Sequence, residues 1–225
     1  MKALADPVIP GEALADIGTD HAFVPIRLLE SGVCPFAVLV DINEGPVVKA
    51  KSHLDECGIS ADKYDLRQGD GLRPVKPFEV SSVIIAGMGG ENIIDILDYD
   101  LQKTKSFKRF ILQPRKRAWL LRKYLLKSGF KITEEKLVRE SEKICEITVA
   151  EPCCENQPLP SDINLLFLPP MMRKDPLFSE FLDEYIRKLK VVLDNMANAQ
   201  TAEDIAASWE DRYNYALDLR KGLKK

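Results

Sequence analysis

Short apolar runs alternate with amphipathic stretches over about the first 150 residues of the chain. The runs predict strands, and the amphipathic stretches between them predict helices. Strands are expected at 13–17, 36–42, 64–68, 80–86 and 109–113, and helices at 22–31, 46–57, 91–98 and 117–128. Continuous apolar strands that alternate with helices favour a mostly parallel α/β sheet with helices on both faces. Two further strands, at 131–138 and 143–151, have a short link and should pair antiparallel at the sheet edge.

The pattern changes after residue 170. Apolar residues there recur at alternating steps of four and three, which is typical of a coiled-coil seam. The seam comprises Phe178, Leu182, Tyr185, Leu189, Val192, Met196 and Ala199. Thr201 is a candidate N-cap for a second helix that runs to about Lys221. We therefore expect one domain at 1–155 and an antiparallel, coiled-coil helical hairpin at 170–225. The alternative is that these helices simply pack on the first domain.

Composition narrows the class of protein. The chain of 225 residues is 45% hydrophobic and 30% charged, which is typical of a soluble globular protein. It has no apolar run long enough for a membrane helix and no signal-peptide pattern. The unpaired, scattered cysteines favour a reducing cytoplasm. Five scattered cysteines without a C-x-x-C pair, and only two histidines, argue against a disulfide framework or a zinc site. We therefore expect no metal.

The net charge of −3 conceals a basic block. Residues 102–143 hold 14 Lys/Arg and four Asp/Glu, whereas the rest of the chain is acidic. Such a block indicates a polyanion partner, and the alternative is a solvated helix face. The candidate phosphate contacts are Arg115, Lys116, Arg117, Arg122 and Lys123. Trp119 lies among them and could stack on a base, although core packing is the favoured interpretation.

Acidic residues and glycines follow four successive strands, where ligands bind in open α/β sheets. The first predicted strand ends in Asp16, Gly18, Asp20 and His21, and the second ends at Asp41. The third is followed by the stretch Gly69–Gly71, and the fourth by the stretch Gly87–Gly90. Together these strand ends predict one binding site.

The chemistry of the first turn restricts the ligand. A dinucleotide site needs a glycine-rich turn around the pyrophosphate, but this turn carries one glycine and the carboxylates of Asp16 and Asp20. Those charges suit a ligand with a cationic centre, an ammonium group and a ribose, as in S-adenosylmethionine. Asp41 lies where ribose recognition is expected, and Asp70 could accept a hydrogen bond from an adenine amino group.

Five segments in this order resemble the TrmK-type bacterial tRNA (adenine-N1)-methyltransferases. They read "ADIGTDHAFVPI", "VDINEGP", "RQGDGL", "IAGMGG" and "FILQP". The resemblance covers roughly Leu4 to Ala150. It implies a class I, Rossmann-like methyltransferase fold with S-adenosylmethionine as the methyl donor. It also implies that the substrate is N1 of adenine 22, on the D-arm side of tRNA. The chain departs from the family at Arg115, where an asparagine is usual after "QP".

The resemblance and the strand ends together assign the site. Donor-binding candidates are Asp16, Gly18, Asp41, Ile42, Asn43, Gly69, Asp70, Gly71, Gly87, Met88 and Gly89. Glycines at 87–90 would let the backbone approach donor and base, although they could also form only a tight turn. Asp20 is the catalytic candidate, because methylated adenine is cationic and a carboxylate would stabilise the developing charge. His21 would orient Asp20 or contact the donor, or it is a loop histidine bonded to backbone.

Two other functions remain open at this point. The chain could methylate a small molecule or a protein, or it could be a non-catalytic RNA-binding protein that kept the fold. The basic block favours RNA over the first alternative, and the acidic and glycine strand ends favour donor binding over the second. We expect a monomer or a weak dimer.

Overall fold

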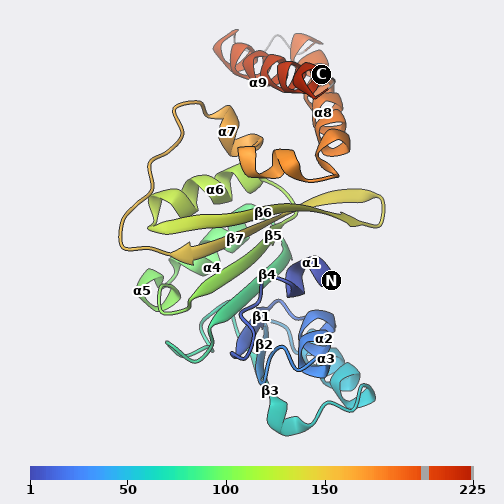
Figure 1. Ribbon diagram of the computed structural model, residues 1–225, viewed down its shortest axis with the longest axis vertical. Coiled ribbons are helices and arrows are strands. Elements are labelled where there is room, and N and C mark those ends of the chain that lie inside the picture. Colours follow the sequence, from blue (N-terminus) through green and yellow to red (C-terminus); the bar gives the residue numbers. More distant parts are fainter. Residues whose placement is uncertain (199–202, 224–225) are drawn as a thin grey trace. The chain divides into compact units, whose positions relative to one another are not determined.

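The computed structural model describes residues 1–198 and 203–223 (Figure 1). The chain divides into two compact units. The first comprises 1–136 and 145–159, and the second comprises 137–144 and 160–225. Residues 137–144 are the tip of the last strand hairpin, so this hairpin contributes to both units.

A seven-stranded sheet forms the centre of the first unit, in the order β3-β2-β1-β4-β5-β7-β6. Neighbouring strands from β3 to β5 are parallel, and β7 runs antiparallel to β5. The sheet is therefore mixed. At its edge β6 and β7 are neighbours joined by only two residues, so they pair antiparallel, as predicted. The strands are β1 (Leu14–Ile17), β2 (Ala37–Asp41), β3 (Tyr64–Gln68), β4 (Ser82–Met88), β5 (Arg109–Pro114), β6 (Phe130–Glu140) and β7 (Lys143–Pro152).

Helices cover the two faces of this sheet (Figure 1). Helices α2 and α3 pack near β1, β2 and β3, whereas α4 packs on α6 beside β4 and β5. The central strands lie between these layers, and Val38, Ile85 and Phe110 are fully buried. Burial on both faces explains their unbroken apolar pattern. The helices are α1 (Lys2–Ala5), α2 (Phe23–Glu30), α3 (Glu44–Glu56), η1 (Ala61–Lys63), α4 (Gly90–Asp98), α5 (Leu101–Thr104) and α6 (Ala118–Lys127).

The second unit is built around a helix pair, α8 (Phe178–Asn198) and α9 (Glu203–Gly222), preceded by α7 (Asn164–Phe167) and η2 (Pro170–Lys174). Its core joins α8 and α9 to η2 and to the hairpin tip. The core residues are Leu137, Leu168, Met172, Phe178, Leu182, Leu189 and Ala216. Arg220 of α9 pairs with Asp183 of α8 at 2.6 Å. The predicted helix pair is thus present, while Ala199 and Thr201 lie outside the described residues.

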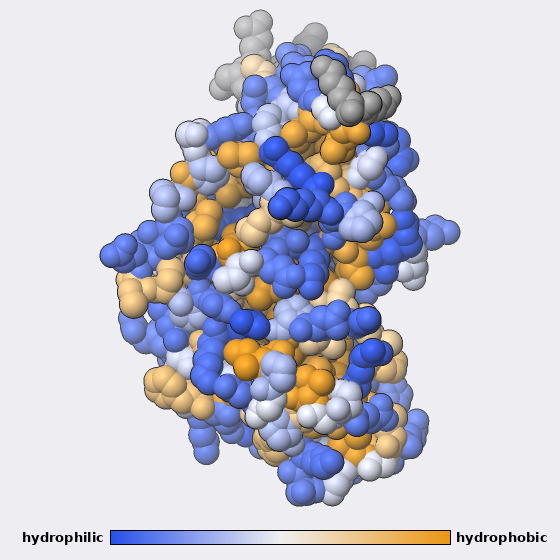
Figure 2. All heavy atoms as spheres, viewed as in Figure 1, coloured by the Kyte–Doolittle hydropathy of each residue, from blue (hydrophilic) through white to orange (hydrophobic). Residues whose placement is uncertain are grey.

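Hydrophilic side chains predominate on the face drawn in Figure 2, and hydrophobic ones form scattered patches. Within the described residues, no helix is both long and apolar enough to cross a membrane. The five cysteines are free thiols.

Candidate functional site

A pocket of about 650 Å³ opens at the carboxyl ends of β1 to β4. This is the point where the strand order reverses, because β1 lies between β2 and β4. Eight predicted donor-binding residues line it: Gly18, Asp41, Ile42, Asn43, Gly69, Asp70, Gly71 and Met88. The other three, Asp16, Gly87 and Gly89, lie outside this lining. The structure therefore brings together most of what the sequence predicted.

Asp41, at the end of β2, is held in place by the turn that follows it. Its Oδ1 accepts a hydrogen bond of 2.9 Å from the amide of Asn43. Its backbone carbonyl accepts one of 2.8 Å from the amide of Gly69, in the next loop. These bonds fix the carboxylate at the pocket wall and tie the loops after β2 and β3 to each other.

A second carboxylate, Asp16, stands near Asp41 in the adjacent strand. Burial raises the pKa of Asp16 to about 6, and repulsion from Asp41 adds to this increase while the Thr19 side chain opposes it. Two acidic groups thus lie near the carboxyl ends of the neighbouring parallel strands β1 and β2. Such a strand edge favours a cationic ligand and disfavours a phosphate.

The glycine stretch after β4 packs against the loop after β5. The amide of Arg115 donates to the carbonyl of Met88 at 2.7 Å, and the amide of Gly90 donates to the carbonyl of Lys116 at 2.9 Å. A Cβ atom on Gly90 would lie 2.6 Å from the carbonyl oxygen of Arg117. At Gly90, therefore, close approach of two backbone segments accounts for the glycine.

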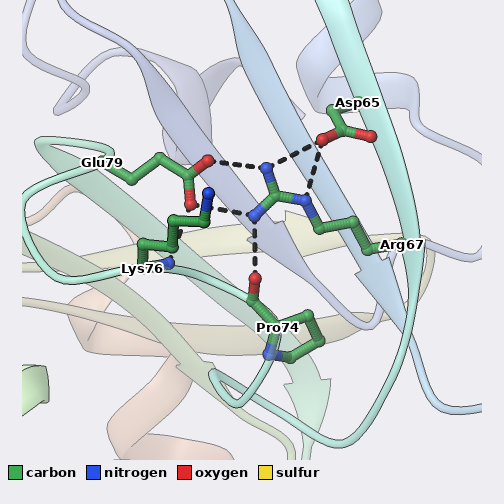
Figure 3. Close-up of polar contacts among 5 residues, drawn as sticks. All are labelled: Asp65, Arg67, Pro74, Lys76 and Glu79. Atoms are coloured by element: carbon green, nitrogen blue, oxygen red, sulfur yellow. Dashed lines mark hydrogen bonds and ion pairs between the residues drawn. The ribbon is translucent and has the colours of Figure 1, made fainter.

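Arg67 holds the loop after β3 in its shape, as Figure 3 shows. Its guanidinium donates to both carboxylate oxygens of Glu79, at 2.6 and 2.8 Å, and to the carbonyl of Pro74 at 2.8 Å. This pairing lowers the pKa of Glu79 to about 2. Asp65 completes the cluster from β3 itself. Arg67 thereby closes the loop that supplies Gly69, Asp70 and Gly71 to the pocket.

The far wall of the pocket was not foreseen from the sequence. It comes from Asn92, Asp95 and Ile96 on α4, from Tyr99 just after that helix, and from Leu72 and Arg73 in the loop after β3. The guanidinium of Arg73 lies 4.0 Å from the centre of the Tyr99 ring and 3.1 Å from the Asp70 carboxylate. The sequence did contain a clue to these residues. Helix α4 directly follows a strand that ends at the site, so its first two turns face the pocket.

The catalytic candidates Asp20 and His21 lie beyond the pocket lining, just after Gly18. Asp20 Oδ2 is 3.2 Å from His21 Nε2, and Oδ1 is 3.5 Å from Lys49 Nζ. The Asp20 side chain is 58% exposed. It is therefore available to a substrate that approaches from solvent.

Three of the predicted RNA contacts, Arg115, Lys116 and Arg117, are exposed in the loop between β5 and α6. Arg117 pairs with Glu91 at the start of α4. Lys123 is half-buried on α6, as is Trp119. Because Arg115 and Lys116 are hydrogen-bonded to the glycine stretch through their backbone, their loop lies directly beside the end of β4.

The structure corrects the prediction that Arg122 contacts RNA. Its side chain is 2% exposed and pairs with Glu135 of β6, which is 1% exposed, and with Glu146 of β7. Burial raises the pKa of Glu135, and the charge of Arg122 opposes this increase. A buried guanidinium with two carboxylate partners cannot reach a phosphate, so the prediction that Arg122 binds RNA is wrong. It instead joins α6 to the last two strands.

Comparisons with known proteins agree with this geometry. The family described as tRNA (adenine(22)-N(1))-methyltransferase matches residues 14–211. The tRNA (adenine(22)-N(1))-methyltransferase of Bacillus subtilis (strain 168) is 34% identical over 151 residues, which is 67% of this chain. The match spans 63% of the length of that relative.

Two solved structures are similar along nearly the whole chain. Sp1610 of Streptococcus pneumoniae, in complex with S-adenosyl-L-methionine, has a TM-score of 0.85 at 29% identity over 97% of both chains. The B. subtilis M1A22 tRNA methyltransferase TrmK has a TM-score of 0.78 at 26% identity over 99% of this chain and 95% of that one. The pocket lies at the switch point of the sheet, and the family match covers most of the chain. This chain therefore belongs to the tRNA (adenine(22)-N(1))-methyltransferase family.

Proposed function

We propose that the protein transfers a methyl group from S-adenosylmethionine to N1 of adenine 22 in tRNA. The observation that carries the proposal is the acidic pocket at the carboxyl ends of β1 to β4 in a chain of this family. The bound donor supplies an electrophilic methyl group on a sulfonium centre.

The pocket residues fit this donor. Its lining carries the carboxylates of Asp41, Asp70 and Asp95, and the one arginine in the lining, Arg73, is already paired with Asp70. Asp41 would accept hydrogen bonds from the ribose hydroxyls, and Asp70 would accept one from the adenine amino group. The negative lining offsets the positive charge of the sulfonium and ammonium groups.

Residues outside the pocket would handle the base. N1 of adenine has a lone pair in the ring plane, so no proton must be removed before attack, and positioning is the main task of the protein. Positive charge develops on the ring during transfer. Asp20 would stabilise that charge, and its effect would strengthen once bound RNA excludes water from its exposed carboxylate. His21 and Lys49 hold the two oxygens of Asp20 in place.

The basic rim, defined as Arg115, Lys116, Arg117 and Lys123, would bind phosphates of the tRNA. Its first three members follow β5 and lie against the glycine stretch, and this position supports a role beside the entering base. We also infer that the protein works in the cytoplasm, where tRNA is modified, as a monomer or weak dimer. The apolar spacing of α8 favours a coiled-coil seam with α9.

Mass spectrometry of nucleosides tests the function directly. Unmodified tRNA incubated with the protein and S-adenosylmethionine should gain 1-methyladenosine. The matched control is the same transcript with guanine in place of adenine 22, which should gain none. Methylation of both transcripts would place the target elsewhere. Donor binding without methylation of any tRNA would favour another substrate, and RNA binding without donor binding would favour a non-catalytic role.

A further inference from the structure

Three aromatic rings gather beside Asp20, outside the donor pocket. His21 stacks on Phe23 with ring centres 5.2 Å apart and on His53 with centres 5.1 Å apart. Phe23 and His53 are also stacked, at 5.5 Å. The interplanar angles are 12°, 19° and 23°. Because all three separations are nearly equal, the rings form a compact, offset group and not a column. We call this group the ring cluster.

The ring cluster is open to solvent on one side, at Phe23, while His21 and His53 are half-buried. Phe23 is 52% exposed, whereas its neighbour Ala22 is buried. Ala22 also has a positive φ of 54°, which is unfavourable for a residue with a Cβ atom. This backbone turn separates His21 from the first residue of α2 and leaves both rings side by side. A strained turn that exposes a phenyl ring favours a binding role over a packing role.

The rings are held from two sides. His53 of α3 donates through Nδ1 to the carbonyl of His21 at 3.1 Å, which fixes its tautomer. The Nε2 atom of His21 lies 3.2 Å from Asp20, while its Nδ1 is buried without a hydrogen-bond partner among the described residues. Stacking and the Asp20 contact therefore orient the His21 ring, and the ring cluster is pre-formed.

We propose that the ring cluster is a stacking surface for the unpaired adenine that is methylated. This inference rests on the proposed function and assigns new roles to Phe23 and His53. N1 lies on the pairing edge, so the base must leave its helix and lose its stacking partners before it reacts. The ring cluster lies just past Gly18 of the pocket, beside the carboxylate that would face the cationic product. Aromatic rings replace lost base stacking in many RNA sites.

Substitutions at Phe23 separate stacking from simple burial. The Phe23→Leu variant keeps apolar bulk without a ring, and Phe23→Tyr keeps the ring. Phe78→Leu is the matched control, because Phe78 is 81% exposed and lies outside the ring cluster. We expect Phe23→Leu to weaken tRNA binding by at least about fivefold. Phe23→Tyr and Phe78→Leu should bind tRNA like the parent, and all three variants should keep the parent's donor affinity and melting temperature.

A fluorescence measurement gives a readout that does not depend on methylation. Tryptophan emission is quenched when a base stacks on the indole, so the Phe23→Trp variant should lose emission when tRNA is added. The Phe78→Trp variant provides the control for the two native tryptophans. Parent-like tRNA binding by Phe23→Leu, or equal quenching in both tryptophan variants, would overturn the stacking surface. Quenching at Phe23→Trp without methylation by the parent would support the surface and refute the proposed activity.

Discussion

Gly18 and Met88 meet in the lining of the donor pocket. A Cβ atom on Gly18 would lie 2.4 Å from Cε of Met88, and Gly18 has a φ of 81°. The tip of the Met88 side chain thus packs closely on the backbone of Gly18. The methionine tip can move, but the backbone conformation remains unfavourable for any residue with a Cβ atom.

The Gly18→Ala variant should therefore lose both stability and donor affinity. We expect about 1–2 kcal/mol of lost unfolding free energy from the positive φ. Displacement of Met88 should weaken donor binding further. Gly58→Ala is the control, since Gly58 has a φ of 67° with no atom within 4 Å of the new Cβ. Denaturant unfolding and calorimetric titration check the two effects, and equal donor affinity in both variants would contradict a role for the Gly18–Met88 contact.

Asp41→Asn should weaken S-adenosylmethionine binding by roughly ten- to a hundredfold, because a charge-assisted hydrogen bond is lost. The amide keeps the size of the side chain and can still accept from Asn43. Asp62→Asn, at an exposed position of η1, is the control. Isothermal titration with the donor measures both variants, and parent-like affinity for Asp41→Asn would remove Asp41 from the site.

Asp20→Asn should lower the rate of methyl transfer by about tenfold or more while both substrates bind as before. A group that acts as charge develops changes the transition state and leaves ground-state binding nearly intact. Glu30→Gln, exposed at the end of α2, controls for the change in net charge. Single-turnover rates at saturating tRNA decide, and a rate equal to that of the parent would exclude a catalytic role for Asp20.

Replacing Arg115, Lys116 and Lys123 together with alanine should reduce the salt dependence of tRNA binding. Each phosphate contact contributes about −0.7 to −0.9 to the slope of log affinity against log salt, so the slope should fall by about two. Donor affinity should not change, because the donor is not a polyanion.

A second triple variant controls for overall charge. Lys63, Lys76 and Lys131 are exposed and lie outside the basic rim. Their replacement with alanine should leave the slope close to that of the parent. If both triple variants flatten the slope equally, the effect comes from net charge, and the basic rim is only a solvated surface.

The stability of the protein should depend on pH through the ionisation of Asp16. Its pKa rises from 3.8 to about 6 on folding, so the native state holds this proton more tightly than the unfolded chain. The contribution of Asp16 to stability must then fall as pH rises from about 4 to 6 and stay constant above that. The total change is on the order of 3 kcal/mol. Relative to Asp16→Asn, the parent should lose stability over this interval, and a difference independent of pH would contradict the shift.

The order of the strands and their parallel arrangement could be predicted from the sequence. Strands buried on both faces, such as β2 and β4, have an unbroken apolar pattern. The sequence also predicted that Asp41 and the loop after β3 lie at the pocket, because ligands bind beyond the strand ends in this type of fold. It placed Arg122 on the surface because arginine within a basic block on a helix usually lies there. The burial of Arg122 depends on Glu135 and Glu146, which come from strands that pair only in the folded sheet.

Long-range partners also explain the pocket residues that the sequence did not reveal. Arg67 supports the pocket loop from outside the lining, on a short strand, and its role depends on Glu79, across that loop. Tyr99 enters the pocket through its contact with Arg73. In each case the role of the residue depends on a partner distant in the sequence, so no local motif reveals it.

The shared hairpin limits how the protein can be shortened. Leu137, at its tip, is buried in the core of the second unit with Leu168 and Met172. A protein cut after Leu159 would keep the entire sheet and the donor pocket but would expose this tip to water. Apolar side chains exposed in this way favour association with other molecules. A soluble minimal enzyme would therefore need polar residues at Leu137 and Ile144, or a shorter turn in place of the tip.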